Sequence, residues 1–155
     1  MAKYDRLKAV SYAQKWALSQ NPKFYHFGGI GGDCTNFISQ CLLAGGAPMN
    51  YDRVNGWFYI NSYNRSASWT SVKYLQNYLL RPKAFGLNAH AEQIENLEIG
   101  DLIQLRQFPN LEFNHTLIIT KITQKEIFVC AHSDDSLNRP LSSYDFEELL
   151  GLHII

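Results

Sequence analysis

Apolar residues recur at helical spacing in the first half of the chain. From Tyr4 to about Ser19 they fall three and four positions apart, which predicts an amphipathic helix that ends near Asn21-Pro22. The same spacing from Cys34 to Leu42 predicts a second helix, and Gly45-Gly46 directly afterwards predicts a left-handed cap. The second apolar face consists of Cys34, Phe37, Ile38, Cys41 and Leu42.

A third helix is predicted from about Ser68 or Trp69 to Leu79, stopping before Arg81-Pro82. An aromatic loop separates it from the second helix and contains Tyr51, Trp57, Phe58, Tyr59 and Tyr63.

The second half of the chain contains short runs rich in Ile, Leu, Val and Thr, a pattern typical of strands. The runs are Leu102 to Leu105, Thr116 to Ile122, Ile127 to Ala131 and Leu152 to Ile155. Gly100-Asp101 begins the first, and Thr123-Gln124-Lys125 is expected to close a hairpin. Helices followed by strands predict an α+β domain in which an antiparallel sheet packs against the helix that carries Cys34.

Composition and length fit one domain over residues 1–155, because 46% of the residues are hydrophobic and can form a core. Fourteen basic residues balance fourteen acidic ones, which disfavours nucleic acid and anionic lipid as partners. No segment approaches the roughly 20 apolar residues of a membrane span. The first ten residues carry charges and no signal-length apolar run. We expect an extracellular or cell-wall location if the chain was cut from a longer secreted protein, and a cytoplasmic one otherwise.

The chain has three cysteines, an odd number, and their spacing does not match that of a disulfide framework, so a disulfide scaffold is not expected. Cys34 is expected in the first turn of a helix, where unpaired amides and the helix dipole favour the thiolate. The preceding glycines would let backbone amides approach an oxyanion, together with the amide of Cys34 itself. The alternative is that Cys34 is a buried apolar residue, which is the interpretation favoured for Cys41 and Cys130.

A cysteine nucleophile needs a base, and the base needs a group that orients it. Among five histidines, His115 begins a predicted strand and is the first candidate for the base. His132 ends the next strand, where hairpin pairing could bring it beside His115, and is the candidate orienting group. A histidine at a strand end is otherwise an ordinary hydrogen-bonded residue.

A zinc site built from Cys130, His132, His115 and Asp134 is the competing interpretation. The sequence lacks the close Cys-x-x-Cys or His-x-x-x-His spacing of zinc ligands, so no metal is expected.

Several stretches resemble NlpC-type and CHAP-like cysteine peptidases of papain fold. They are Tyr25-His26-Phe27-Gly28-Gly29, Asp33-Cys34-Thr35, Gly100-Asp101-Leu102 and His115 at a strand start. A longer set resembles the bacterial family named putative amidase domain, over nearly the whole chain. It comprises Asn21-Pro22, Gly32 to Leu42, Ala44-Gly45-Gly46 and Ser68-Trp69-Thr70. The resemblance implies a papain-like fold with a Cys-His dyad and a third polar residue.

Carried over by residue, the resemblance makes Cys34 the nucleophile and His115 the general base. The third role falls to His132, with Asp134 or Asp135 as alternatives because the hairpin is longer than the family pattern. Tyr25 matches a tyrosine that assists the oxyanion site, and Asp33 a residue that can contact a substrate amine. Thr35-Asn36 departs from the Ser-Gly that usually follows the cysteine.

The resemblance implies hydrolysis of an amide through a thioester, with peptidoglycan peptides or a small amide as substrate and no metal or organic cofactor. Two alternatives stay open: an acyl transferase that uses the same dyad, and an inactive scaffold whose aromatic loop, Trp57 to Tyr63, binds glycan or peptide. The sequence predicts no oligomeric state.

Overall fold

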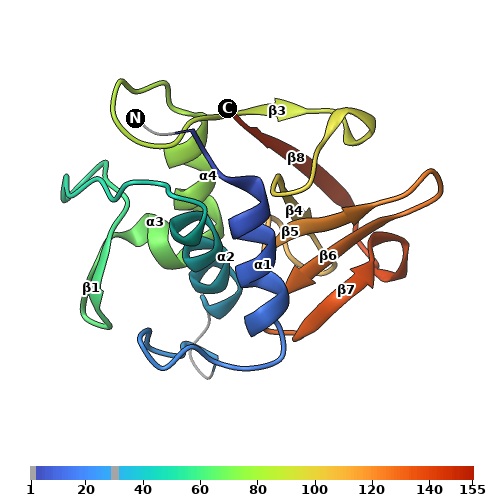
Figure 1. The fold of residues 1–155 in the computed structure, drawn as a ribbon, viewed down its shortest axis with the longest axis horizontal. Helices are drawn as coiled ribbons and strands as arrows, with labels where there is room; N and C mark the ends of the chain where they lie inside the picture. Colours follow the sequence, from blue (N-terminus) through green and yellow to red (C-terminus); the bar gives the residue numbers. More distant parts are fainter. Residues whose placement is uncertain (1–2, 29–31) are drawn as a thin grey trace.

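The computed structural model describes residues 3–28 and 32–155, and it has an α+β architecture with helices on one side of an antiparallel sheet (Figure 1). The helices are α1 (Arg6–Trp16), α2 (Asp33–Ala44), α3 (Ala67–Thr70) and α4 (Val72–Leu80), with short 3-10 turns η1 (Ile94–Asn96) and η2 (Leu141–Ser143). The strands are β1 (Tyr59–Asn61), β2 (Asn64–Arg65), β3 (Ala89–Glu92), β4 (Leu102–Arg106), β5 (His115–Ile122), β6 (Ile127–Ala131), β7 (Ser136–Pro140) and β8 (Glu148–Ile154).

The main sheet has the strand order β3-β8-β4-β5-β6-β7, and each neighbouring pair is antiparallel. Helices α1 and α2 lie side by side against β5 and β6 (Figure 1). Strands β1 and β2 form a separate small hairpin on the other side of the helices. The first residue of β5, His115, is therefore held near the end of α2 that carries Cys34.

Both faces of the central strands are buried, which explains why these strands have continuous apolar runs instead of alternation. Leu102, Ile118 and Cys130 point to the helix side, where they pack with both helices. Their neighbours Ile103 and Ile119 point to the opposite face, into a second and smaller cluster.

The predicted helices are confirmed with adjusted ends. Helix α1 begins after Asp5, whose carboxylate accepts from the amide of Lys8 at 3.0 Å, and it ends at Trp16, earlier than predicted. Helix α2 ends at Ala44, and the left-handed residue of its cap is Gly46, with φ of 94°.

The third predicted helix is two helices, because Ser71 is extended between α3 and α4 and caps α4 by accepting from the amide of Tyr74 at 3.2 Å.

The strands β4, β5, β6 and β8 confirm the four predicted runs, and Thr123 closes the β5–β6 hairpin by donating its amide to the Glu126 carbonyl at 2.9 Å. The edge strands β3 and β7 were not predicted. Edge strands need fewer apolar residues than central ones, and β7 ends in Pro140, which a central strand would not tolerate.

The central part of the aromatic loop, at Trp57 and Phe58, belongs to the core. Trp57 is 1% exposed and its indole donates to Ser39 Oγ at 3.0 Å, while Phe58 is also buried. Trp69 packs against Trp57 with ring centroids 4.8 Å apart. Tyr51 and Tyr63, in contrast, are exposed.

Candidate active site

Cys34 is the second residue of α2, at the end of a sharply turned backbone. The preceding Gly32 has φ of 90°, and a Cβ there would come within 2.8 Å of the Thr70 carbonyl oxygen. A side chain at position 32 would therefore be strained and would also collide with the backbone. Local sterics thus require the glycine that brings Cys34 into the first helical turn.

A pair of hydroxyls links the helix end to the strand end. Thr35 follows Cys34, Thr116 follows His115, and their Oγ1 atoms lie 3.1 Å apart in the interior. Gln104 on β4 also reaches Thr116, with its Nε2 3.4 Å from Oγ1. These contacts hold the starts of α2 and β5 together, and they explain one departure from the family pattern, the threonine after the cysteine.

The thiol and the imidazole shift one another's pKa toward the ion pair. Burial raises the pKa of Cys34, but hydrogen bonding and charge attraction from His115 outweigh it and bring this pKa below its ordinary value. For His115, burial lowers the pKa, while Asp134 and Cys34 raise it to about 9. Both shifts favour a thiolate beside an imidazolium.

Asp134 is the carboxylate that faces His115. Its Oδ1 lies 3.5 Å from His115 Nε2, which has no closer hydrogen-bond partner among the described residues. The His115 side chain is 7% exposed and Tyr144 covers it with ring centroids 6.1 Å apart. The buried nitrogen is thus directed at a single acceptor across a slightly long gap.

Arg139 on β7 holds Asp134 from the other side. Its Nη1 donates to Asp134 Oδ2 at 2.9 Å, and its remaining nitrogens donate to Ser143 Oγ at 2.8 Å and to the Ser143 carbonyl at 3.0 Å. The guanidinium lies 3.7 Å from the centroid of the Tyr144 ring. Burial raises the pKa of Asp134, but His115 and Arg139 lower it overall, so the carboxylate is ionised.

A cavity of about 500 Å³ opens over these groups. Its described lining comprises Gly32, Cys34, Gln107, Asn114, His115, Ser133, Asp134, Arg139, Ser143, Tyr144 and Asp145. The lining is mostly polar, and it contains the thiol, the imidazole and the carboxylate together. The sequence did not indicate Arg139 or Tyr144, because both lie in an edge strand and turn without a recognisable motif.

The structure differs from the sequence-based expectation for His132, because this ring does not lie against His115. Its Nδ1 is 2.8 Å from Asp33 Oδ2 and its Nε2 is 2.7 Å from the Trp16 carbonyl oxygen. The left-handed residue Ser133, with φ of 77°, turns the chain between His132 and Asp134. The two side chains therefore diverge, and the alternative named for the third position, Asp134, is the one that faces His115.

Asp33 lies in the interior and is 1% exposed. Its Oδ1 accepts from the amide of Phe27 and from Asn36 Nδ2, both at 3.1 Å, and its Oδ2 is taken by His132. Burial raises its pKa, but these hydrogen bonds lower it overall. With both oxygens occupied, the carboxylate is not available to a substrate amine, contrary to the expectation from the resemblance.

Tyr25 is half exposed and packs edge-on against Phe27, with ring centroids 4.8 Å apart. It is not among the described residues that line the cavity. The predicted approach of glycine-loop amides to an oxyanion involves residues 29–31, which lie outside the described residues. The oxyanion role of Tyr25 stays a prediction.

The other cysteines are buried core residues. Cys41 is 0% exposed, and burial raises the pKa of its thiol well above the ordinary value. Cys130 is 0% exposed and lies beside Thr120 and Asn138, and burial raises its pKa as well. Only Cys34 has a lowered thiol pKa among these three cysteines.

The set considered for zinc does not converge, because His132 faces Asp33 while Cys130 faces Thr120 and Asn138. In residues 3–28 and 32–155, no group of three or more His, Cys, Asp and Glu side chains is arranged to hold a metal ion. None of the described helices is long and apolar enough to cross a membrane.

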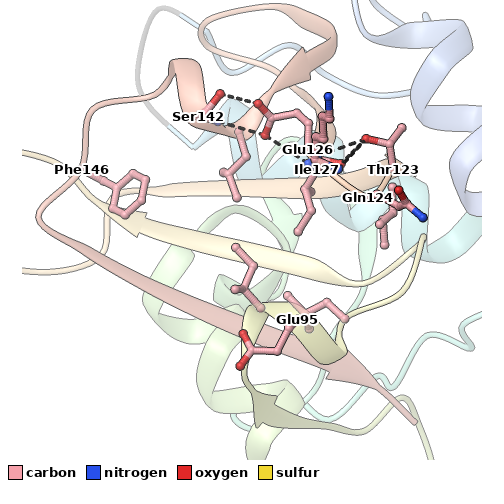
Figure 2. Close-up of a pocket in the computed structure, with 12 residues that line it drawn as sticks. Glu95, Thr123, Gln124, Glu126, Ile127, Ser142 and Phe146 are labelled. Carbon is pink, nitrogen blue, oxygen red and sulfur yellow. Dashed lines mark hydrogen bonds between the residues drawn. The ribbon is translucent and has the colours of Figure 1, made fainter.

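A second cavity of about 500 Å³ lies on the face of the sheet away from the helices (Figure 2). It is largely apolar, and Phe146 and Ile127 contribute to its wall. One of its two carboxylates, Glu126, accepts hydrogen bonds from the Ser142 amide and hydroxyl. The described lining contains neither a cysteine nor a histidine, so it offers no pair like that of Cys34 and His115.

Two Bacillus subtilis (strain 168) proteins are similar to this chain. One, named "Uncharacterized protein YhbB", is 44% identical over 119 residues, which cover 75% of this chain and 37% of the relative. The other, named "Uncharacterized protein YjcM", is 27% identical over 146 residues, which cover 88% of this chain and 32% of the relative. The chain thus spans about a third of the length of these relatives.

No solved structure matches the chain at a significant level. The family model described as the putative amidase domain matches residues 3–155, nearly the whole chain. The resemblance noted in the motif from Gly32 to Leu42 thus extends from helix α1 to strand β8, and the chain belongs to the putative amidase domain family.

Proposed function

We propose that this domain is a cysteine-dependent amide hydrolase in which Cys34 is the nucleophile, His115 the general acid and base, and Asp134 the group that orients His115. The observation that carries the proposal is the convergence of these three side chains on one polar cavity, from the first turn of α2, the start of β5 and the turn after β6. The family description supports amide hydrolysis as the reaction class.

The resting state of the dyad is a thiolate and an imidazolium. The pKa of Cys34 is lowered and that of His115 is raised to about 9, and both shifts favour the state in which the proton lies on the imidazole. Nε2 of His115 faces Asp134, which leaves Nδ1 to exchange its proton with the thiol and the substrate. The thiolate is a far better nucleophile than the thiol.

The reaction begins when the Cys34 thiolate attacks the carbonyl carbon, forming a C–S bond and moving the π electrons onto oxygen. The amide of Cys34, at the positive end of the helix dipole, stabilises this oxyanion. Collapse of the intermediate breaks the C–N bond, and His115 donates its proton to the departing amine. Water then attacks the thioester while His115 accepts its proton, and the C–S bond breaks to return the thiolate.

Asp134 supports both proton transfers. Its carboxylate faces His115 Nε2, and Arg139 holds its second oxygen, so that the imidazole ring has one preferred orientation. A charged carboxylate also stabilises the imidazolium that each cycle regenerates. His132 cannot fill this place while both its nitrogens are engaged elsewhere.

For the scaffold we propose a papain-like arrangement, with a nucleophile-bearing helix against an antiparallel sheet that carries the base. For the substrate we propose the peptide amides of peptidoglycan, on the resemblance of the motifs around Cys34 and Asp101 to NlpC-type peptidases. The polar lining of the cavity is suited to a peptide backbone, which presents many hydrogen-bonding groups.

The test is incubation of purified sacculi and soluble muropeptides with the wild type, Cys34→Ala and the control Cys41→Ala, with products identified by mass spectrometry. The wild type and Cys41→Ala are expected to release the same fragments, and Cys34→Ala none. A parallel reaction with an added amine acceptor distinguishes hydrolysis from acyl transfer, which would yield the acylated amine.

Release of the same fragments in equal amounts by the wild type and Cys34→Ala would overturn the assignment of Cys34 as the nucleophile. Ordinary thiol pH dependence of Cys34 alkylation, together with no turnover of muropeptides or simple amides, would instead favour an inactive binding scaffold.

A further inference from the structure

His132 is buried between the two halves of the candidate site. It follows β6 directly, and its side chain is 2% exposed. Its ring stacks on Phe37 of α2 with centroids 4.0 Å apart and an interplanar angle of 11°. Its nitrogens reach Asp33, the first residue of α2, and the carbonyl of Trp16, the last residue of α1. One side chain thus contacts both helices and belongs to the turn after β6.

Both ring nitrogens donate hydrogen bonds. The Trp16 carbonyl, 2.7 Å from Nε2, can only accept, and the ionised Asp33 carboxylate, 2.8 Å from Nδ1, can only accept as well. His132 is therefore an imidazolium paired with a carboxylate in the interior. The remaining Asp33 oxygen is also hydrogen bonded, which is the condition under which a buried ion pair can persist.

Two other titratable side chains near this pair are His26 and Asp135. His26 precedes α2, and its Nε2 lies 3.5 Å from Asp33 Oδ2, with the side chain 51% exposed. Asp135 in the turn adds an attractive charge toward His132. From α1 the contact is a backbone carbonyl at the negative end of the helix dipole, which also favours the imidazolium.

This pair is connected to both catalytic halves through adjacent backbone. Asp33 immediately precedes Cys34, so fixing its carboxylate fixes the helix turn that presents the thiol. Asp134 follows His132 by two residues, across the left-handed Ser133. A shift of the His132 ring would therefore move the helix terminus and the turn relative to each other.

We propose that His132 is a positioning residue: through Asp33 it fixes the helix end that carries Cys34, and through the Ser133 turn it fixes Asp134 against His115. The catalytic consequence rests on the proposed function, since Cys34 and His115 react there. Misplacement of reacting groups by about 1 Å can lower a rate about 100-fold, so His132 affects the rate although it does not touch substrate.

The test compares His132→Ala, Asp33→Asn and the control His153→Ala in the purified domain. The control breaks another histidine–aspartate pair, in which His153 Nδ1 lies 2.9 Å from Asp101 Oδ2, outside the described lining of the cavity. The first measurement is the rate of Cys34 alkylation by iodoacetamide against pH, with the modified peptide identified by mass spectrometry. The second is kcat and KM for a muropeptide or simple amide.

His132→Ala is expected to raise the pH midpoint of Cys34 alkylation by about one pH unit, because the thiolate loses its fixed place beside His115. It is also expected to lower kcat about 10- to 100-fold while KM changes less than about threefold. His153→Ala is expected to lower the melting temperature but to keep the wild-type midpoint and kcat.

Asp33→Asn is the rescue variant, and it also decides the test if His132→Ala does not fold. A neutral His132 can accept from the new amide through Nδ1 and still donate to Trp16 through Nε2. At pH 8 we therefore expect the wild-type alkylation rate and kcat within about threefold. As the pH falls below about 6.5, protonation of His132 sets two donors against each other, and kcat drops more steeply than in the wild type.

The role of His132 is limited to stability if folded His132→Ala keeps the wild-type pH midpoint of Cys34 alkylation and the wild-type kcat. The same holds if His153→Ala changes these two quantities equally. An equally steep fall of kcat at low pH in Asp33→Asn and in the wild type would also limit His132 to a stability role. These outcomes overturn the positioning role alone, because wild-type activity stays intact. If the wild type turns over no amide, alkylation still decides between positioning and simple stability, and an ordinary thiol midpoint in the wild type would overturn both proposals.

Discussion

Two histidine–aspartate pairs each have one member in the turn after β6, His132 in one and Asp134 in the other, and they are built in opposite ways. His132 and Asp33 are 2.8 Å apart, nearly without solvent exposure, and all their hydrogen-bonding atoms are engaged. His115 and Asp134 are 3.5 Å apart at the wall of a cavity, and Nε2 of His115 has no closer partner among the described residues.

Two pairs of the same residue types therefore differ in how many of their hydrogen-bonding atoms are already engaged. A histidine whose two nitrogens are both committed to acceptors cannot give up a proton without leaving a buried group unsatisfied. A histidine with one nitrogen on an orienting carboxylate and the other free toward a cavity can exchange its proton with a substrate. Unused hydrogen-bonding capacity is therefore the feature to look for.

The largest expected difference in activity is between the variants His115→Gln and His132→Gln. His115→Gln removes the general acid and base and is expected to lower kcat/KM about 1000-fold. The same variant should change the free energy of unfolding by less than about 1 kcal/mol. His132→Gln should cost more stability and less activity. Kinetics and urea unfolding of both variants measure these effects. An equal loss of activity in the two variants would contradict the different roles proposed for the two histidines.

The next effect is the pH dependence of stability that comes from the buried pair. The folded pKa of His132 is raised, because its bonds to Asp33 and Trp16 outweigh burial, and that of Asp33 is lowered. The histidine contribution is complete below its unfolded pKa of about 6.5 and is lost as pH rises through the folded value. The aspartate contribution is complete above about 3.9 and is lost as pH falls through the folded value.

Both contributions are complete only between about pH 4 and pH 6.5. In that window His132→Ala should lower the free energy of unfolding by about 3 kcal/mol, with a smaller difference at pH 9. The control Leu42→Val, in the same helix without a titratable group, should lower it by about 1 kcal/mol at every pH. Urea unfolding at several pH values measures both, and a difference for His132→Ala that is independent of pH would contradict an ion pair.

A smaller effect is expected at Asp134. Asp134→Asn removes the charge that raises the pKa of His115, so the imidazolium is lost at a lower pH. The basic limb of the pH profile of kcat/KM should therefore move below about 9. The maximal kcat should fall about tenfold, because the imidazole is less well oriented. An unchanged basic limb would mean that another group sets this pKa.

The smallest effect is expected at Arg139. Arg139→Lys keeps a positive charge near Asp134 but cannot reproduce the fork that also binds Ser143. We expect kcat to fall about threefold with little change in KM. Arg106→Lys is the matched control, since Arg106 pairs with Glu148 at 3.1 Å outside the described lining of the cavity. Equal kinetics for the two variants would show that the Arg139 fork is dispensable.

Periodicity was sufficient for the central elements of the fold. Helix α2 and strand β5 were predicted because a buried stripe and a doubly buried run each leave a strong hydrophobic signal. The edge strands left none, and the break at Ser71 was invisible because apolar spacing continues from Trp69 through Leu75. At such places side-chain capping and edge position decide the structure.

For the candidate site, the sequence indicated the two groups that begin elements, Cys34 at a helix start and His115 at a strand start. It did not separate His132 from Asp134, because residues two apart in an extended strand point to the same side. The positive φ of Ser133 breaks that alternation and directs one side chain inward and the other to the cavity. Arg139 and Tyr144 become neighbours of Asp134 only through the β6–β7 pairing and the turn that follows it.

The α+β class, the helix that carries Cys34 and the presence of candidate nucleophiles and bases can be read from the amino-acid sequence alone. These properties depend on local periodicity and on residues adjacent in the chain. Which histidine meets which aspartate depends on the folded chain, because Asp33 and His132 are 99 residues apart and their distance is set by how the helices dock on the sheet. The same docking buries one pair and leaves the other at the wall of the cavity, and the separate roles proposed for them rest on that difference.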